Sequence, residues 1–431
     1  MVEMKDSGIK WIGKIPFGWD IVPFGYLLRE RSEKNYPIRT DERLSLSIDK
    51  GVTLYADKTT NLDRYKDDVS QYKIAQIGDF VMNSMNMIVG AVGVSDYFGC
   101  VSPAYYTFYD CESDSCYCRY CDYLFHTKEL KHVLFGLGKG IMAIDRGDGK
   151  VNTCRLKVSR YDLKRLKLPI PPLKIIRKIV SFLDKKCFEI NELQLGIEKQ
   201  IETLEEYKRS IITEVITKGL NPNVKMKDSG IEWIGKIPKY WEIEKGKYTL
   251  RYLQKAVKED DGVITCFRDG EVTLRSNRRE DGFTMSDKEI GYQGIDIGDL
   301  VVHGMDGFAG AIGISDSRGK ASPVLNVLDT DENKKYYMYY LRSMAYSDVF
   351  LATATGIRVR SCDLRWAKIA ELPFPIPSRK EQDEIVSYID RICNGANEII
   401  ADKKKQLEVL DQYKKSLIYE YVTGKKEVPE D

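Results

Sequence analysis

The 431-residue sequence predicts an α+β protein: two globular α/β domains separated by two long antiparallel coiled-coil helices, arranged as a pseudo-two-fold repeat. Two observations lead to this fold class. Four blocks of sequence occur twice in the same order. Each copy also ends in a stretch of about 45 residues without proline, in which apolar residues recur every three or four positions. The predicted boundaries are a first domain at 1–172, a helix at 173–219, a second domain at 220–377, a helix at 378–424 and a tail at 425–431.

The repeated blocks are the strongest signal in the sequence. The first block reads MKDSGIKWIGKIP in one copy and MKDSGIEWIGKIP in the other. Between the shared blocks, residues 20–76 and 242–296 diverge strongly, so one scaffold carries two different interiors. That pattern is typical of a protein that presents two different recognition surfaces on one symmetric frame. The blocks start at residues 4, 77, 168 and 206 in the first copy and at residues 226, 297, 372 and 412 in the second.

Each copy runs from short strands to one long helix. The Gly-Asp-Phe-Val and Gly-Asp-Leu-Val segments begin β-branched runs that single glycines interrupt, which indicates short twisted strands. A Pro-rich segment then closes each domain, because proline disfavours helix in the residue before it. In the heptad seams, Lys208 and Lys414 form the same polar interruption, a device that can fix the register of two helices. Gly219 and Pro222 end the first helix.

Composition limits the functions that the chain can have. There are 67 Lys and Arg residues against 65 Asp and Glu, so the formal charge is only +2. This near-balance excludes a chain that binds polyanions through bulk charge alone, and any nucleic-acid surface must be a local patch. The sequence shows no signal peptide and no apolar stretch near the ~20 residues of a membrane span. Ten cysteines without a secretory signal predict reduced thiols in a cytoplasmic protein.

Motifs that would carry catalysis are missing from the sequence. It contains no Walker A loop, no G-x-G-x-x-G segment between a strand and a helix, and no Asn-Pro-Pro-aromatic motif of adenine methyltransferases. The three histidines, His126, His132 and His303, are too scattered for a triad. We therefore predict no catalytic residues and a binding role.

A cysteine cluster is the best candidate for a metal site. Four thiols within eleven residues, with His126 nearby, could ligate zinc. Their spacing is not that of a standard zinc finger, and the second copy has tyrosines at about the same place, so we expect core packing and no metal site. The four are Cys111, Cys116, Cys118 and Cys121.

Basic residues cluster inside the divergent parts of both copies. Near the Pro-rich segments, each copy has a basic, Gly-flanked stretch, and arginine or lysine flanked by glycine can approach phosphates and guanine edges closely. The alternative is that these stretches are solvated surface loops. The predicted DNA-binding residues are Lys139, Arg146, Lys150 and Arg155 in the first copy and Arg268, Arg275, Arg278, Arg279, Arg358 and Arg360 in the second.

The four blocks, in this order, resemble the specificity (S) subunits of type I restriction–modification enzymes. The segments KDSGIEWIGKIPKYW, KEQDEIVSYID and DQYKKSLIYEYVTGK and the two GD-[FL]-V strands carry the resemblance, which covers essentially the whole chain. It implies that 1–172 and 220–377 are target-recognition domains for an asymmetric bipartite DNA site. It also implies two methyltransferase (M) subunits as partners and, in the full complex, two restriction (R) subunits. S-adenosylmethionine, ATP and magnesium would be bound by those partners, and this chain would be a non-catalytic subunit without cofactors.

Three other interpretations stay open at this point. Within the same class, the chain could be the recognition subunit of a type IIB-like system with a fused partner. It could instead be a coiled-coil scaffold without a DNA role, although the divergence of the two interiors argues against this. It could also be a DNA-modifying enzyme in its own right, which methyl transfer by the isolated chain would establish.

Overall fold

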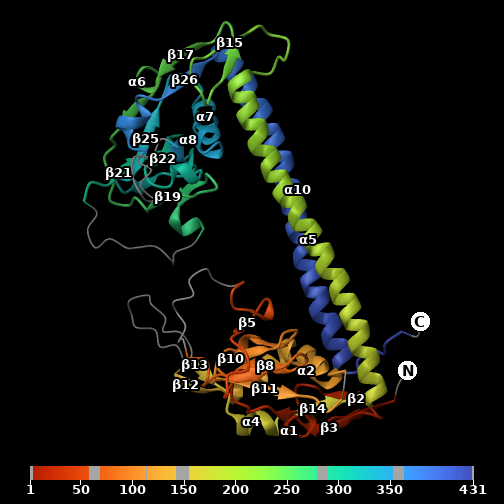
Figure 1. Ribbon diagram of the computed structural model, residues 1–431. Helices are drawn as coiled ribbons and strands as arrows, with labels where there is room; N and C mark the ends of the chain where they lie inside the picture. Colours follow the sequence, from red (N-terminus) through yellow and green to blue (C-terminus); the bar gives the residue numbers. More distant parts are fainter. Residues whose placement is uncertain are drawn as a thin grey trace. The chain divides into compact units, whose positions relative to one another are not determined.

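The computed structural model describes residues 3–57, 68–112, 114–141, 155–278, 290–352 and 364–429. Its chain divides into two compact units (Figure 1). Unit 1 consists of Met1–Gly196 and Gln406–Asp431, and unit 2 consists of Ile197–Lys405. Each unit contains one globular domain and one part of each long helix.

The domain of unit 1 is built from short strands and helices. Its elements are β1 (Met4–Asp6), β2 (Lys14–Pro16), β3 (Asp20–Pro23), α1 (Phe24–Leu27), β4 (Arg29–Glu30), β5 (Leu44–Ser47), β6 (Gly51–Leu54), β7 (Lys73–Ala75), β8 (Phe80–Asn83), η2 (Met87–Val89), β9 (Val92–Val94), β10 (Gly99–Val101), β11 (Tyr105–Tyr109), α2 (Cys116–His126), α3 (Lys128–Leu137), β12 (Lys139–Ile141), β13 (Arg155–Lys157), α4 (Arg160–Arg165) and β14 (Lys167–Ile170).

The domain of unit 2 follows nearly the same order. Its elements are β15 (Met226–Asp228), β16 (Lys236–Pro238), β17 (Glu242–Lys245), α6 (Gly246–Thr249), β18 (Arg251–Leu253), β19 (Ile264–Cys266), β20 (Val272–Leu274), η3 (Arg275–Asn277), β21 (Gln293–Ile295), β22 (Leu300–His303), η4 (Gly307–Ala309), β23 (Ile312–Ile314), β24 (Gly319–Ala321), β25 (Leu325–Asp329), α7 (Lys334–Tyr346), α8 (Val349–Ala352), α9 (Trp366–Ile369) and β26 (Pro373–Ile376).

The sheets of the two domains have matching topology. The largest is a four-stranded antiparallel sheet, in the order β4-β11-β8-β9 in unit 1 and β18-β25-β22-β23 in unit 2. The hairpins β5–β6 and β19–β20 pair in the same register, and β3–β14 and β17–β26 join the start of each domain to its Pro-rich end. Proline lacks the N–H group that an inner strand needs, but both strands of a two-stranded sheet are edge strands, so the prolines in these last two pairs are tolerated.

A small apolar core lies under each hairpin, and it uses equivalent positions in both units. It has seven members in unit 1, and each has a counterpart 220 residues later in the unit 2 core, as Leu44 corresponds to Ile264. This region includes much of the sequence that diverges between the copies. The divergence therefore lies in the outward side chains, while the inward positions stay apolar. The pairs are Leu44/Ile264, Leu46/Cys266, Val52/Val272, Ala75/Ile295, Val81/Val301, Ala91/Ala311 and Val101/Ala321.

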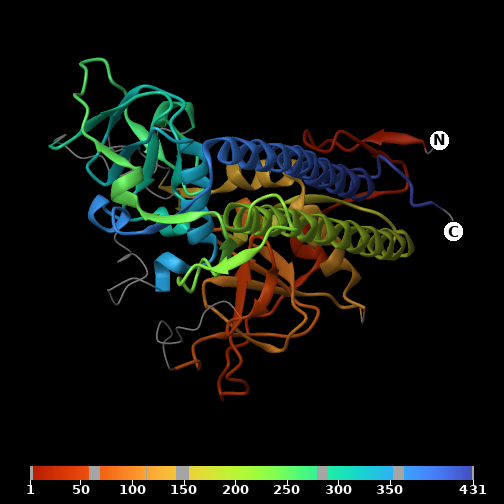
Figure 2. The ribbon, with the colours of Figure 1, turned by 90° about the horizontal axis from the view of Figure 1, so that it is seen from above.

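The two long helices, α5 (Leu173–Lys218) and α10 (Arg379–Val422), lie side by side and antiparallel (Figures 1 and 2). In unit 1, the Lys414 ammonium donates to the Asn191 side-chain oxygen at 2.7 Å. In unit 2, Lys208 makes the equivalent bond to Asn397 at 2.6 Å. The predicted fold class is confirmed, and both polar interruptions of the heptad seams are used between the helices.

Each domain is fixed to the helices by a buried tyrosine. The Tyr120 hydroxyl of α2 lies 2.9 Å from the Pro169 carbonyl and 2.8 Å from the Val422 carbonyl at the end of α10. Tyr336 of α7 makes the same pair of contacts, to Pro375 and to Ile216 near the end of α5. In each unit, one tyrosine hydroxyl therefore joins the last strand of the domain to the end of a long helix.

The first repeated block packs against the end of a long helix in each unit. Trp19 and Trp241 are buried there, whereas Trp233 is 39% exposed. Gly424, after α10, approaches Pro16 and Trp19, as Gly219 approaches Trp241. Trp19 and Trp241 thus belong to the core. None of the helices in the described ranges has both the length and the apolar character to cross a membrane.

Candidate functional site

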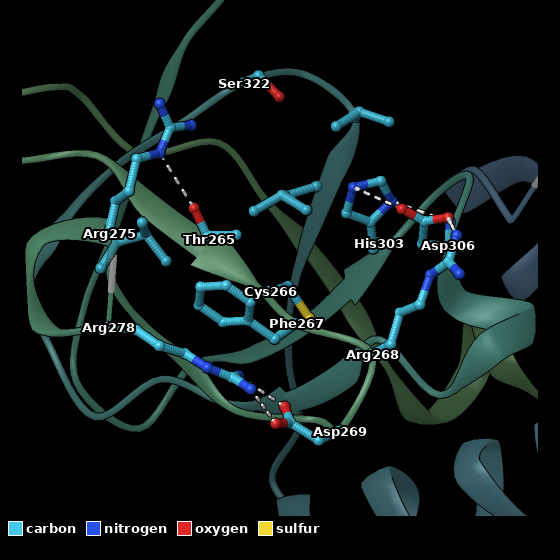
Figure 3. Close-up of a pocket in the computed structure, with 13 residues that line it drawn as sticks. Thr265, Cys266, Phe267, Arg268, Asp269, Arg275, Arg278, His303, Asp306 and Ser322 are labelled. Carbon is cyan, nitrogen blue, oxygen red and sulfur yellow. Dashed lines mark hydrogen bonds and ion pairs between the residues drawn. The ribbon is translucent and has the colours of Figure 1, made fainter. Parts of the chain in front are cut away.

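A pocket of about 550 Å³ opens in the domain of unit 2 (Figure 3). We call it the unit 2 pocket. The hairpin β19–β20 and η3 form one side of it, and the end of β22 with the following turn forms another. Its lining residues are Ile264, Thr265, Cys266, Phe267, Arg268, Asp269, Arg275, Arg278, His303, Asp306, Ser322, Val324 and Leu325.

The turn of the β19–β20 hairpin, which carries Arg268, is held in place from α7. Arg342 donates from Nη2 to the Gly270 carbonyl at 2.8 Å and from Nε to the Ile312 carbonyl at 2.7 Å. Gly310 fits closely on the other side, because a Cβ there would lie only 2.7 Å from the Arg268 carbonyl oxygen. The backbone of Arg268 is therefore in a fixed position, which favours a defined orientation of its side chain.

Arg278 is the most constrained cation of the pocket. Its Nη1 and Nη2 donate to the two carboxylate oxygens of Asp269 at 3.0 and 2.6 Å, and Nη1 also donates to Glu271 at 3.1 Å. The guanidinium stacks 4.2 Å from the centre of the Phe267 ring. Its hydrogen bonds to Asp269 raise the pKa of Arg278. Burial opposes ionisation of Asp269, but the bonds and charge of Arg278 together with backbone N–H groups outweigh it and lower the pKa of that carboxyl.

Arg268, Asp306 and His303 form a row on the opposite side of the pocket (Figure 3). Arg268 Nη2 lies 2.9 Å from Asp306 Oδ1, and His303 Nε2 lies 3.9 Å from Asp306 Oδ2. His303 Nδ1 accepts the backbone N–H groups of Met305 and Asp306, so the ring proton of the neutral imidazole is on Nε2. Burial lowers the pKa of His303, which keeps the ring neutral at pH 7.

The remaining side chains set the charge and reactivity of the pocket. Arg275 donates from Nε to Thr265 Oγ1 at 3.4 Å. Burial raises the pKa of Cys266 to about 12, so its thiol is protonated and unreactive at neutral pH. Three arginines and two aspartates line the pocket, and Glu271, which binds Arg278, adds a third carboxylate. Its guanidinium N–H groups thus suit a polar ligand that offers hydrogen-bond acceptors.

Some of the predicted DNA-binding residues come together and others do not. The structure brings Arg268, Arg275 and Arg278 into one pocket. Lys139 belongs to unit 1, where its ammonium lies 3.3 Å from Asp162. Arg155 is part of β13, whose backbone pairs with β12, but its side chain is not described. The five others lie outside the described residues: Arg146, Lys150, Arg279, Arg358 and Arg360.

The cysteine cluster packs as part of a domain core. Cys116, Cys118 and Cys121 are buried in the unit 1 core, while Cys111 is exposed. Burial raises the pKa of Cys116 to about 12, and thiolates are the form that binds zinc. Within the ranges that the structure describes, no three His, Cys, Asp or Glu residues are arranged to hold a metal ion. Cys121 follows Tyr120 in the first copy as Tyr337 follows Tyr336 in the second. The same core position is therefore occupied by a thiol in one copy and by a phenol in the other.

His303 and Asp306 were not predicted from the sequence as site residues. They lie far from the arginines along the chain, within a block that the two copies share. The sequence does hold a signal for them: the second copy has His303 and Asp306 where the first has Asn83 and Asn86, although Gly90 and Gly310 shortly after them match. A change of polar residue type inside an otherwise shared block could have marked both positions.

Unit 1 has the same backbone frame but different side chains at the equivalent positions. Asn83 accepts the Met85 N–H from the same turn in which His303 accepts the Met305 N–H. The two arginines of the hairpin correspond to an exposed isoleucine and a half-buried tyrosine. One frame therefore presents two chemically different surfaces. The pairs are Arg268/Ile48, Arg275/Tyr55, His303/Asn83 and Asp306/Asn86.

This chain is similar to a known domain family and to two curated proteins, all of them from type I restriction systems. The family model described as "Type I restriction modification DNA specificity domain" matches residues 249–409, which include the whole unit 2 pocket. A putative type I restriction enzyme specificity subunit of Methanocaldococcus jannaschii, MjaX, is 26% identical over 287 residues, covering 62% of this chain and 61% of the relative. The MjaVIII specificity subunit of the same organism is 25% identical over 287 residues, covering 62% of this chain and 64% of the relative. The match thus spans less than two thirds of the length of either relative.

The fold has a similar counterpart among solved structures. A chain from a structure described as the basis of complex assembly and conformational transition of the type I R-M system aligns with a TM-score of 0.65. That alignment covers 96% of this chain and 99% of the other at 12% identity, so it supports the fold alone. The predicted resemblance is therefore confirmed: residues 249–409 match the type I restriction modification DNA specificity domain, and the chain is similar to the specificity subunits of type I restriction enzymes.

Proposed function

We propose that this chain is the DNA-recognition subunit of a type I restriction–modification complex. Each domain would bind one half of an asymmetric bipartite site in double-stranded DNA, and the helices α5 and α10 would link the two domains. The chain itself would be non-catalytic. Two methyltransferase subunits would dock on it and, in the full complex, bring two restriction subunits.

One observation carries this proposal: the two domains share a backbone frame but differ at equivalent surface positions. Arg268 and His303 of unit 2 correspond to Ile48 and Asn83 of unit 1, while the core beneath them stays apolar in both. Two different DNA half-sites require the same backbone frame with different outward residues. A scaffold without a ligand would have no need of two such different surfaces.

The chemistry of the unit 2 pocket supports the DNA part of the proposal. Its arginines can donate to phosphate oxygens and to acceptors on base edges. The small formal charge of the whole chain, +2, fits a subunit whose partners supply part of the phosphate contacts. The repeated helices and SGI-x-WIGKIP blocks offer two equivalent surfaces for two copies of one partner.

The partners would supply the reactive groups. In this proposal S-adenosylmethionine belongs to the methyltransferase subunits, and ATP and magnesium belong to the restriction subunits.

The proposal is tested by sequencing modified bases in cells that carry this gene with its methyltransferase partner and in cells that lack it. We expect one additional methylated motif that has two short specific halves around a nonspecific spacer. A DNA-free scaffold would add no motif, and that result would refute the proposal. Methylation by the isolated chain, measured with radiolabelled methyl donor, would instead identify it as an enzyme.

A further inference from the structure

The row Arg268–Asp306–His303 presents hydrogen-bonding groups in a defined order. Arg268 offers only donors, the ionised Asp306 offers only acceptors, and neutral His303 offers the Nε2–H donor. Asp306 stands between the other two, 2.9 Å from Arg268 and 3.9 Å from His303. The order across the pocket is therefore donor, acceptor, donor.

We propose that this row reads one A·T base pair in the major groove and that Asp306 is the residue that rejects G·C. This inference rests on the proposed function, because it assigns a base pair to the half-site that unit 2 would bind. It concerns specificity, and the residues involved have no part in the methyl-transfer chemistry.

The choice of A·T follows from the major-groove edges of the base pairs. An A·T pair presents adenine N7 as acceptor, adenine N6 as donor and thymine O4 as acceptor. That order, acceptor–donor–acceptor, is complementary to the row of this pocket. A T·A pair presents the same order from the other strand, so the row accepts either orientation by hydrogen bonding.

The middle group decides against G·C. In a G·C or C·G pair the central group of the edge is the guanine O6 acceptor, which would face the Asp306 carboxylate. Two acceptors cannot share a hydrogen bond, and the negative charge adds repulsion. One mismatched contact of this kind lowers binding by roughly ten- to a hundredfold.

The three groups are fixed before DNA arrives. Backbone N–H groups of Met305 and Asp306 hold His303 Nδ1, so the imidazole can present only Nε2–H. The Arg268 backbone is fixed by the Arg342 and Gly310 contacts, and Asp306 takes up one of its five N–H groups. All three side chains remain reachable, with exposed fractions of 57% for Arg268, 33% for Asp306 and 19% for His303.

Arg278 is not part of the base-reading row. Asp269 and Glu271 engage both of its terminal nitrogens, and Phe267 covers one face of the guanidinium. Unit 1 cannot read DNA in the same way, because Ile48 and Asn86 replace the cation and the carboxylate of the row. The row therefore acts only on the half-site of unit 2.

The experiment compares methylated motifs in cells that express the complete complex with wild-type chain or with Asp306→Asn. The asparagine can turn its amide N–H toward guanine O6, which removes the clash at the centre of a G·C pair, while cytosine N4–H₂ still faces one donor of the row. The preference for A·T over G·C at one position of one half-site should therefore weaken. Sites with G·C at that position should gain methylation by about tenfold or more. The other half-site should stay unchanged, which also shows that the variant complex is folded.

Two controls isolate the effect. Asp269→Asn alters the other aspartate of the same pocket, which binds Arg278, and should leave the A·T position intact. Asn86→Asp introduces a carboxylate at the equivalent position of unit 1 and should alter only the other half-site.

The inference is overturned if the wild-type motif has no position restricted to A or T in the half that unit 2 reads. It is also overturned if Asp306→Asn leaves the motif as it was or relaxes several positions together. In each of these cases a bipartite motif is still found, so the proposed function survives. Absence of any motif with the wild-type chain would instead refute the proposed function.

Discussion

At the scale of single residues, the arginines that the sequence groups together have different environments. Arg278 is held by two carboxylates and stacked on Phe267, whereas Arg268 has Asp306 as its hydrogen-bond partner within the described ranges. The basic cluster could be predicted from the sequence because arginines and lysines are identified directly by residue type. The sequence could not predict this division of roles, because the aspartates and His303 come into contact with the arginines only through strand pairing.

We predict that Arg278→Ala weakens DNA binding by a similar factor for all sequences. With its terminal nitrogens already engaged, Arg278 has no fork left to read a base, and its loss leaves Asp269 and Glu271 uncompensated near the DNA. The added repulsion should weaken binding to every sequence, and more at low than at high salt. The measurement is fluorescence anisotropy of the chain with its methyltransferase partner on several duplexes, across a range of salt concentrations. Relaxed preference at a single base position would show that Arg278 reads a base instead.

A second residue-scale prediction concerns Glu381, at the start of α10. Its carboxylate accepts the Trp241 indole N–H at 3.1 Å and the Tyr240 hydroxyl at 2.9 Å, and Trp241 is fully buried. Glu381→Ala leaves the indole N–H without this acceptor and should lower the free energy of unfolding by about 1–3 kcal/mol.

Chemical denaturation followed by tryptophan fluorescence measures that loss, with Glu381→Gln as the control because it retains an acceptor. Equal stability of Glu381→Ala and wild type would mean that the contact contributes nothing. The equivalent position in unit 1 is Ile175, so the sequence alone gives no reason to expect this bond from the repeat.

At the scale of elements, both lysines of the heptad seams bond to an asparagine of the other helix. The two bonds, Lys208 to Asn397 and Lys414 to Asn191, are equivalent under the repeat. A specific polar pair between helices favours one register over its shifted alternatives. The lysines and the register role were predictable from the seam, but the asparagines were not, because nothing in a single sequence tells which residues of an antiparallel partner lie opposite.

A double-mutant cycle tests this pairing. We predict that Lys208→Met and Asn397→Ala are coupled by about 0.5–1.5 kcal/mol in the free energy of unfolding, because each substitution removes the same hydrogen bond. The matched cycle at Lys414 and Asn191 should give a similar value. Additive effects in both cycles would show that the two bonds do not stabilise the helix pair.

At the scale of the whole molecule, the repeat could be predicted well and the site only in part. The four blocks predicted two domains of one fold and two long helices, because identical scaffolds keep identical glycines, prolines and seams. Sequence divergence at 20–76 and 242–296 suggested different interiors, yet the strands there pair in the same register in both units. Both copies keep apolar residues at the inward positions of these short strands, although the residue types differ. The two sequences can therefore diverge while the fold stays the same.

The most direct test of two independent recognition domains is to exchange residues 20–76 for the corresponding segment of a relative with a known site. Modified-base sequencing then reports both half-sites of the hybrid in one measurement. We predict that one half-site changes to that of the donor and that the other half-site, with the spacer length, stays as it was. A change in both halves, or in neither, would contradict the assignment of one half-site to each domain.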